Sequence, residues 1–505
     1  MNFAQAMYRE GSTKLTENGA FAYDSTGQGA LLDLFSQIGA LRTRDEYDIK
    51  QKFAAAYREN PLLAVKMLFY AGDIRQGGLG ERRTFRICLR WLADNHPSTV
   101  LKNLELIPYF NRFDSLFVLV STDCESKMWE LIAKILTEDT RAMKASKNGK
   151  HVPASLLAKW MPSENASSVQ TRDLANKAIK ALHLNPRTYR KMLSALRKHV
   201  NVTERMMSAG EWGQIDYAKV PSYAMHNYGS AFAKHDYERF NAYLQSVRKG
   251  EVKINASVLY PYDLVEKYMN TREVGTYYGD CFVARNENAV VEAQWKAMPN
   301  YINEGLNIVA MADVSGSMRG RPMASSISLA IYLAQHNVGA YRNQYMTFTD
   351  NPHFVNLREG CSLLEAVQET ASAGVGYSTN LMKAMDEILR VAVVNRVSES
   401  ELPKAMLVLS DNEIDCYFHP SANWDFMDTL EAKFRAAGYR HCPKLIMWNI
   451  NARHDTFLSN REDVVLVSGQ SASTFKNLVR ALNGMTAYEY MVSILNGKAY
   501  EKIHI

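Results

Sequence analysis

The sequence predicts an α + α/β protein in which an all-helical N-terminal part precedes a doubly wound α/β domain. Two observations lead to this prediction. Between residues 1 and 297, apolar residues recur at the spacing of helix faces, and turn signals separate the segments. From about residue 300, apolar runs of strand length alternate with segments of helix length, which is typical of a mainly parallel sheet. We therefore expect two domains, residues 1–297 and 298–505.

The N-terminal part contains six segments in which apolar residues follow helical periodicity. These segments are Leu31–Leu41, Leu62–Tyr70, Thr84–Asn95, Met128–Leu136, Thr171–Leu182 and Tyr189–Val200. Helical pairs of about 30–45 residues without a strong strand pattern predict a stacked, HEAT-like array, in which each pair buries its apolar face on its neighbours. The polar stretch Arg141–Gln170 interrupts this pattern, and we expect it to be an exposed excursion.

The C-terminal part predicts six strands and five helices. The strands are Asn307–Ala312, Gln344–Phe348, His353–Asn356, Ala405–Leu409, Lys444–Trp448 and Val464–Val467. The helices are Met323–Asn337, Leu363–Ala371, Leu381–Val394, Trp424–Ala437 and Thr474–Leu482. In a doubly wound sheet, the functional crevice lies beyond the carboxyl ends of the strands. Asp313 and Asp411 both fall at such ends, so we expect them to lie in this crevice.

Oxygen-bearing side chains occur in three separated segments of this part, each next to an apolar element. Hard divalent cations such as Mg²⁺ take oxygen ligands, so this pattern predicts a cation site. The first of these segments carries the pattern Asp313-x-Ser315-x-Ser317, which, taken alone, is more typical of a loop or of a helix N-cap. Thr379 and Asp411, later in the chain, complete the set, and each position follows or precedes an apolar element as such a site requires. The candidate metal residues are Asp313, Ser315, Ser317, Thr379 and Asp411.

These five positions resemble the metal-ion-dependent adhesion site of von Willebrand factor A domains. The resemblance implies that Ser315, Ser317 and Thr379 contact the metal, while Asp313 and Asp411 hold its waters. It implies Mg²⁺ as the cofactor, or alternatively Mn²⁺ or Ca²⁺. Neutral direct ligands leave the cation electrophilic, so the resemblance also implies a sixth ligand, an Asp or Glu side chain of a partner protein.

Further segments and the order of the domains resemble TROVE-type proteins of uncharacterised function, relatives of the Ro ribonucleoprotein autoantigen. Ro proteins join a ring of HEAT-like repeats to a von Willebrand A domain, and they bind small non-coding RNAs and the single-stranded ends of misfolded RNAs. The resemblance therefore implies an RNA-binding scaffold, although the sequence leaves open whether the array closes into a ring. The segments that carry it are Thr16–Thr26, Leu31–Phe35, Asp73–Arg83, Tyr189–Lys198, Val220–Ala224 and Asp236–Phe240.

Charge is distributed unevenly and supports a polyanion contact in the helical part. Residues 1–300 contain 41 Lys and Arg against 32 Asp and Glu, whereas residues 301–505 contain 18 against 21. Residues 141–200 hold 13 basic and 2 acidic residues. Phosphates require Lys and Arg on one surface, and exposed bases stack on aromatic rings. The candidate RNA-binding residues are Lys177, Lys180, Arg187, Tyr189, Arg190, Lys191, Arg197 and Lys198. The alternative is a solvated helical face whose Tyr189 packs inward.

A glycine-rich stretch at Arg75–Arg83 offers a second basic candidate. Its glycines permit backbone amides to approach a phosphate at a helix N-terminus. The stretch lacks the Gly-Lys-Ser/Thr ending of a P-loop, so nucleotide hydrolysis is not expected. The alternative that we favour is a tight turn between helices in which Arg75 or Arg82 pairs with an acid.

Other features exclude several function classes. No catalytic Ser-His-Asp or Cys-His arrangement has local support, so we expect no enzymatic activity. We interpret Asn412, Glu413 and Asp415 as residues that tune ligand entry, in preference to a second metal site for hydrolysis. Six scattered cysteines without a C-x-x-C pair, no secretory signal and no span-length apolar stretch predict a cytoplasmic protein away from membranes. We also expect a monomer. Two hypotheses remain: an RNA-binding scaffold that also recruits a partner, or a metal-dependent protein-interaction module without RNA binding.

Overall fold

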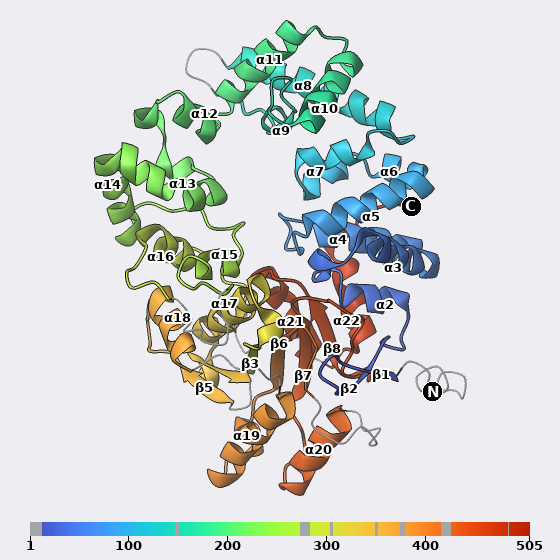
Figure 1. Ribbon diagram of the computed structural model, residues 1–505, viewed down its shortest axis with the longest axis vertical. Coiled ribbons are helices and arrows are strands. Elements are labelled where there is room, and N and C mark those ends of the chain that lie inside the picture. The colour runs from blue at the N-terminus through green and yellow to red at the C-terminus, as the bar shows by residue number, and fades with distance from the viewer. Residues whose placement is uncertain are drawn as a thin grey trace. The chain divides into compact units, whose positions relative to one another are not determined.

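The predicted fold class is confirmed by the computed structural model, in which a helical region precedes a six-stranded, mostly parallel sheet (Figure 1). The structure describes residues 13–146, 151–272, 283–302, 307–348, 352–373, 380–415, 426–482 and 484–505. The chain forms two compact units that interleave along the sequence. The sheet unit comprises Met1–Asp73, Gly77–Thr84 and Ala256–Glu501, and the helical unit comprises Ile74–Gln76, Phe85–Asn255 and Lys502–Ile505.

The six-stranded sheet has the order β5-β4-β3-β6-β7-β8, and all of its neighbouring strands are parallel except β4 and β5. Its strands are β3 (Ile308–Asp313), β4 (Gln344–Phe348), β5 (His353–Asn356), β6 (Ala405–Ser410), β7 (Lys444–Asn449) and β8 (Val465–Ser468). These bounds agree with the predicted strands to within one residue. Every residue of β3 and β6 is buried, which is typical of central parallel strands covered on both faces.

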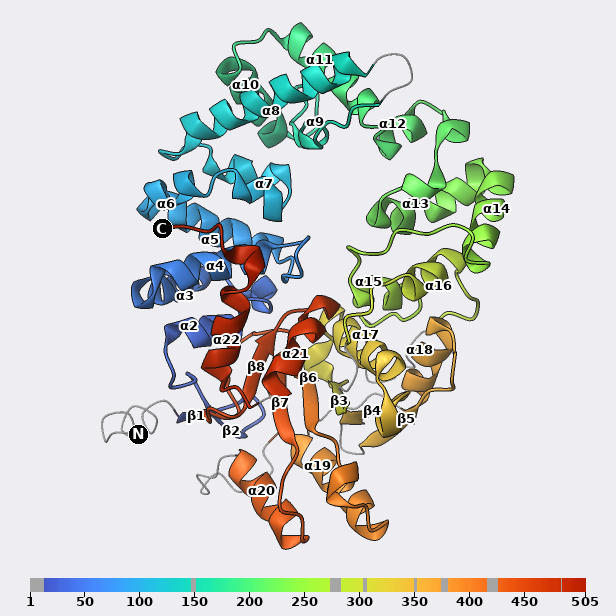
Figure 2. The same cartoon turned by 180° about the vertical axis from the view of Figure 1, so that it is seen from behind.

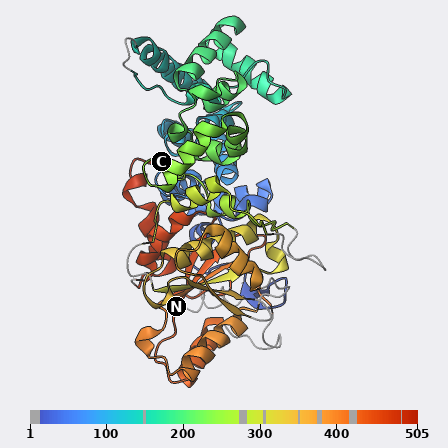
Figure 3. The ribbon, with the colours of Figure 1, turned by 90° about the vertical axis from the view of Figure 1, so that its left-hand side faces the viewer.

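Helices follow the strands of the sheet unit as the alternating pattern predicts. They are α17 (Arg321–His336), α18 (Leu363–Ser372), α19 (Leu381–Val394), α20 (Phe426–Ala436), α21 (Phe475–Leu482) and α22 (Ala487–Leu495). Helix α17 packs on β3, β4 and β6, and α19 and α20 lie side by side at one end of this unit (Figure 3). The sixth helix, α22, was not predicted; it begins with a capping box formed by Thr486 and Glu489.

Part of the N-terminal chain belongs to the sheet unit. The elements concerned are β1 (Thr13–Leu15), β2 (Phe21–Tyr23), α2 (Ala30–Phe35), α3 (Glu46–Glu59) and α4 (Pro61–Gly72), together with α15 (Pro261–Val265) and α16 (Ala289–Lys296). Helix α2 packs on β8 and on α22, which lies in front of β8 in Figure 2. The antiparallel pair β1–β2 was missed because strands of three residues leave no periodicity to detect.

The chain between α2 and α3 corrects the prediction of one helix over Leu31–Leu41. The helix ends at Phe35, and the following turn brings Gly39 against the backbone of β8. The Gly39 amide donates to Ser468 Oγ at 3.0 Å, and Ser468 Oγ donates to the Phe35 carbonyl at 3.1 Å. These bonds to a strand more than 400 residues away satisfy backbone groups that a longer helix would have satisfied internally.

Helices make up most of the described part of the helical unit. They are α5 (Arg82–Asn95), whose first residues belong to the sheet unit, α6 (Pro97–Lys102), α7 (Leu106–Phe110), α8 (Glu125–Ala145), α9 (Leu157–Trp160), α10 (Val169–Ala181), α11 (Pro186–His199), α12 (Thr203–Ser208), α13 (Ser222–His235) and α14 (Tyr237–Arg248). The helices predicted at Thr84–Asn95, Met128–Leu136, Thr171–Leu182 and Tyr189–Val200 correspond to α5, α8, α10 and α11.

The stretch Arg141–Gln170 is not simply an exposed excursion. Leu157 and Met161 are buried, and α9 packs against α8 and α11. The carboxylate of Asp139 accepts hydrogen bonds at 2.6 Å from both the amide and the hydroxyl of Ser155. A few apolar anchors therefore hold a polar segment in place, although its composition resembles that of a loop. Within the described residues, no helix combines the length and apolar character needed to cross a bilayer.

Candidate metal centre

Asp313 and Asp411 lie at the same edge of the sheet because their strands are parallel neighbours. Asp313 is the last residue of β3, and Asp411 directly follows β6. The two strands pair with Ala312 opposite Leu409. On the other sides of β3 and β6 lie β4 and β7, so the winding direction of the sheet reverses between β3 and β6. In open α/β sheets, ligands bind at this point, beyond the carboxyl ends of the strands.

The carboxylate of Asp313 is fully buried and is oriented by two hydrogen bonds. The Ser315 amide donates to its Oδ1 at 2.9 Å, and the hydroxyl of Ser410 donates to its Oδ2 at 2.6 Å. The Ser315 and Ser317 hydroxyl oxygens lie 3.1 Å apart. The first part of the predicted ligand set therefore forms one cluster at the end of β3.

Asp411 is buried beside the same cluster and has three kinds of partner. Its Oδ1 accepts a hydrogen bond from the Glu413 amide at 3.1 Å, and its Oδ2 lies 3.0 Å from Nη2 of Arg453. The side chain of Ser317 also hydrogen-bonds to Asp411. Thus Asp313, Ser315, Ser317 and Asp411 come together as predicted, whereas Thr379 lies outside the described residues.

The electrostatics of this cluster favour a cation. Burial, and after it the negative charge of Asp411, raise the pKa of Asp313 to about 7. Burial also raises the pKa of Asp411, and Arg453 offsets part of that effect. A buried carboxylate is costly without a compensating positive charge, and in the described part of the chain Asp313 makes no ion pair.

The donor set fits a hard divalent cation: carboxylates and hydroxyls supply only oxygen. Among the described residues, no group of three or more His, Cys, Asp and Glu side chains is arranged to hold a metal. The candidate centre is of another composition, because it combines two carboxylates with two serine hydroxyls. These residues are Asp313, Ser315, Ser317 and Asp411.

Comparison with known proteins matches both parts of the chain to family models. The family model described as a domain of unknown function, DUF2828, matches residues 16–112 and 126–305, more than half of the chain. The chain belongs to the DUF2828 family. A second domain of unknown function, DUF7788, matches residues 307–495. The chain is also 28% identical over 505 residues to the uncharacterized protein L728 of Acanthamoeba polyphaga mimivirus, covering 92% of this chain and 84% of the viral protein.

In this DUF2828 protein, the segment Thr16–Gly19 lies against the loop that follows Asp411. The Glu17 amide donates to Glu413 Oε2 at 2.7 Å, and the Thr16 hydroxyl donates to the Ile414 carbonyl at 2.7 Å. Glu413 is itself buried, and its other oxygen accepts a hydrogen bond from Thr456. The sequence predicts Glu413 as a residue that tunes ligand entry but gives no sign of its contact with the N-terminal segment. No local signal links positions almost 400 residues apart.

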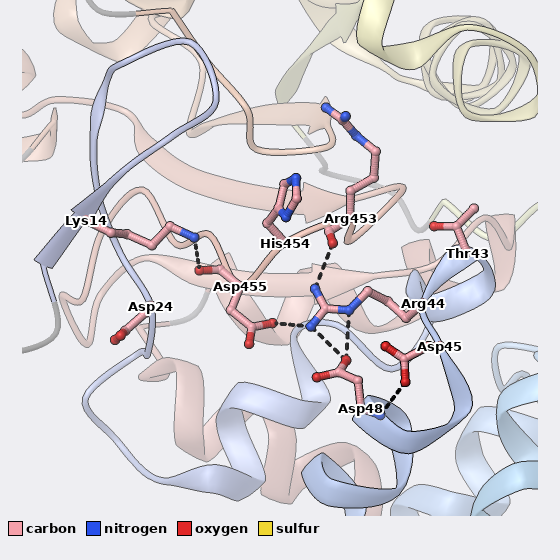
Figure 4. Close-up of a pocket in the computed structure, with 9 residues that line it drawn as sticks. All are labelled: Lys14, Asp24, Thr43, Arg44, Asp45, Asp48, Arg453, His454 and Asp455. Carbon is pink, nitrogen blue, oxygen red and sulfur yellow. Dashed lines mark hydrogen bonds and ion pairs between the residues drawn. The ribbon is translucent and has the colours of Figure 1, made fainter.

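In the DUF2828 protein, a groove of about 750 Å³ is lined by the loop that carries Arg453 and by the N-terminal chain, and within it Arg44 pairs with Asp48 and Asp455 (Figure 4). Arg44 donates to the Arg453 carbonyl at 2.8 Å and lies 3.1 Å from Asp455 Oδ1. Lys14 donates to the Asp455 carbonyl at 2.9 Å. These contacts tie the loop that carries Arg453 to the N-terminal chain. The remaining lining residues are Asp24, Thr43, Asp45, Asp48 and His454.

The basic candidates of the DUF2828 protein separate into exposed and structural residues. The ring of Tyr189 is 0% exposed and its hydroxyl donates to the Pro162 carbonyl, so it cannot stack on a base. Arg197 donates to the carbonyls of Ala158 and Met161 and is likewise structural. Arg190 pairs with Glu164. Arg190 and the remaining basic candidates on α10 and α11 are exposed; these remaining candidates are Lys177, Lys180, Arg187, Lys191 and Lys198.

The glycine-rich stretch of the DUF2828 protein forms a turn, in agreement with the structural alternative. Gly77 and Gly80 have φ of 97° and 69°, a region that favours glycine. The Gly78 amide donates to Asp73 at 3.1 Å. The guanidinium of Arg75 donates to the carbonyls of Pro108 and Asn111. Carbonyl capping by arginine therefore holds this turn.

Proposed function

We propose that this protein binds a divalent cation, Mg²⁺ in the first instance, and uses it to hold an acidic side chain of a partner protein. Asp313, Ser315, Ser317 and Asp411 would hold the cation, and Thr379 joins them by its resemblance to the adhesion site of von Willebrand A domains. The observation that carries the proposal is the pair of buried carboxylates, Asp313 and Asp411, at the reversal point of the sheet.

The residues around the pair have distinct tasks in this proposal. Ser410 and the Ser315 amide hold the Asp313 carboxylate in one orientation, and Arg453 holds Asp411. Burial of both carboxylates excludes bulk water and so strengthens their attraction for a cation. A bound cation would supply the electrophilic centre that receives a partner's carboxylate. The proposal includes no enzymatic step.

Manganese binding tests this function, since Mn²⁺ occupies magnesium sites and is visible by electron paramagnetic resonance. We expect one Mn²⁺ per chain in the natural protein and its loss in Asp313→Ala and Asp411→Asn. Asp123→Asn, which changes an exposed carboxylate of the helical unit, serves as the matched control and should bind normally. Circular dichroism checks that the variants fold. A natural protein that binds no Mn²⁺ would contradict the proposal.

If the cation holds a partner, association should depend on it. A partner recovered from the native source should be released by EDTA and restored by Mg²⁺, and Asp313→Ala should not retain it. Recovery that is the same with and without metal would count against a role of the cation in binding.

RNA binding is a second candidate function, supported by the exposed cations of α10 and α11 and by the resemblance to TROVE-type proteins. Lys177, Lys180, Arg187, Lys191 and Lys198 are exposed within a stretch that has few acids. Because each phosphate contact releases counterions, binding should weaken steeply with salt. We expect that Lys180→Glu combined with Arg187→Glu and Lys191→Glu weakens RNA retention on filters. Lys404→Glu in the sheet unit is the control, and RNA affinity unchanged by the triple substitution would contradict this candidate.

A further inference from the structure

The segment Thr16–Gly19 brings a carboxylate of its own to the candidate metal centre. Besides the bonds of Thr16 and Glu17, the Asn18 side chain donates to the Glu413 carbonyl at 2.8 Å, and Gly19 forms a bridge with Asp415. Successive residues thus hold the segment along the loop that follows Asp411. The side chain of Glu17 is thereby placed at the entry of the centre, not in the core.

Glu17 and Asp411 share one guanidinium nitrogen. Nη2 of Arg453 lies 2.7 Å from Glu17 Oε2 and 3.0 Å from Asp411 Oδ2. Nε2 of His454 lies 2.9 Å from the other oxygen of Glu17. A guanidinium presents donors that match carboxylate oxygens, so Arg453 is a ready receptor for a carboxylate next to Asp411. In this structure, Glu17 holds that position.

Exposure distinguishes the two acids that share Arg453. The side chain of Asp411 is 0% exposed, whereas Glu17 is 43% and His454 is 48% exposed. Solvent screens the contacts of Glu17, so they are weak and exchangeable, while Asp411 is fixed by its surroundings. An arriving carboxylate would therefore replace Glu17 on Arg453 and leave Asp411 in place.

We propose that Glu17 is an internal competitor for the carboxylate that the metal face receives, and that Arg453 is the second anchor of that carboxylate. The proposal rests on the proposed function. One oxygen of the partner's carboxylate meets the cation, and the other takes the position of Glu17 on Arg453. A carboxylate has two equivalent oxygens for these two anchors, and its negative charge replaces that of Glu17 beside Arg453. A neutral amide would not replace that negative charge.

Acetate is a suitable probe because it is a carboxylate without other recognition groups. The Mn²⁺-loaded full-length protein is titrated with acetate, and water-proton relaxation reports both Mn²⁺ binding and displacement of Mn²⁺-bound water. We expect Glu17→Gln to bind acetate about fivefold more tightly than the natural protein, since a nearby like charge is removed. Adding Arg453→Met to this variant should abolish the gain. Glu46→Gln, the same change at an exposed glutamate of α3, should leave the affinity unchanged.

The outcomes separate this inference from the proposed function. If Mn²⁺ binds the natural protein and Glu17→Gln, but both take acetate with equal affinity, Glu17 is only a structural contact and the inference is overturned alone. A gain that persists after Arg453→Met also overturns it, because Arg453 is then no anchor. If no Mn²⁺ binds to the natural protein, the proposed function fails and the inference fails with it.

Discussion

The hydroxyl of Ser410 on β6 donates a 2.6 Å hydrogen bond to Oδ2 of Asp313 on the neighbouring strand β3. Both residues are fully buried. The same hydroxyl oxygen accepts a hydrogen bond from the Asn412 amide at 3.1 Å, at a position where Asn412 has a φ of 67°. Ser410 therefore links the orientation of the Asp313 carboxylate to the turn that carries Asp411.

Replacing Ser410 by Ala should weaken cation binding without unfolding the protein. Groups that orient a metal ligand typically contribute 10- to 100-fold in metal affinity, so we expect a loss of about tenfold in Mn²⁺ affinity. Isothermal titration calorimetry measures the change. Ser398→Ala, at an exposed serine of the sheet unit, is the control. Unaltered Mn²⁺ affinity in Ser410→Ala would show that this hydrogen bond does not position the ligand.

Gly39→Ala should destabilise the sheet unit strongly. A Cβ at Gly39 would lie 2.6 Å from the Gly469 Cα and 2.7 Å from the Ser468 carbonyl carbon, and backbone atoms cannot move aside as a flexible side chain can. Overpacking of this kind costs about 1–3 kcal/mol. Urea unfolding measures it, and Gly213→Ala, whose nearest neighbour is Arg239 Nη1 at 3.7 Å, should change stability far less. Equal stabilities of the two variants would argue against the close approach of the turn after α2 to the end of β8.

Asp455→Asn should lower stability near neutral pH but not in acid. Burial alone would raise the pKa of Asp455, but the charges of Lys52 and Arg44 outweigh it and lower the pKa overall. The stabilisation is therefore present above the unfolded-state pKa of about 4 and is lost as pH falls through the lower folded value. We expect a difference of about 1 kcal/mol between the natural protein and the variant at neutral pH. Chemical denaturation across pH measures it, and a difference that persists in acid would contradict the assignment.

A fragment beginning at residue 298 should fold poorly, although the change in periodicity places a domain boundary there. In the intact chain, α2 packs on β8 and α22, and the ring centroids of Phe35 on α2 and Tyr490 on α22 lie 6.2 Å apart. The fragment would expose these faces to water, at about 25 cal/mol per Å² of apolar surface. Hydrogen exchange should show β8 and α22 poorly protected in the fragment and well protected in the whole protein. Equal protection in both would mean that the N-terminal chain is dispensable.

Arg197→Met and Lys191→Met should have opposite phenotypes. Arg197 donates to the carbonyls of Ala158 and Met161 and to the Ser163 hydroxyl. Its loss leaves these acceptors without this donor and should cost about 1–3 kcal/mol of stability. Lys191 is exposed, so its loss should leave the melting temperature unchanged and weaken only polyanion binding. Differential scanning calorimetry separates the two effects. Equal melting temperatures would contradict the structural role of Arg197.

Local patterns were sufficient for the sheet and for part of the candidate centre. Apolar runs such as Ala405–Leu409 predicted β6, because a strand buried on both faces has no polar alternation. Because Asp313 and Asp411 directly follow such apolar runs, the sequence also predicted that they lie at strand ends. Tyr189 was harder: its helical position beside Arg190 suits a base-stacking residue, but its neighbours in space bury it completely. Local spacing does not tell which side of a helix another segment covers.

The sequence by itself determined the fold class and the strand positions, and it singled out Asp313, Ser315, Ser317 and Asp411 as candidate oxygen ligands. These depend on periodicity and on residue types that lie within a few positions of one another. Only the tertiary structure decided that Thr16–Gly19 lies against the loop after β6 and that Glu17 shares Arg453 with Asp411. Contacts between residues about 400 positions apart depend on how distant segments pack, and that packing leaves no mark in the periodicity of either segment.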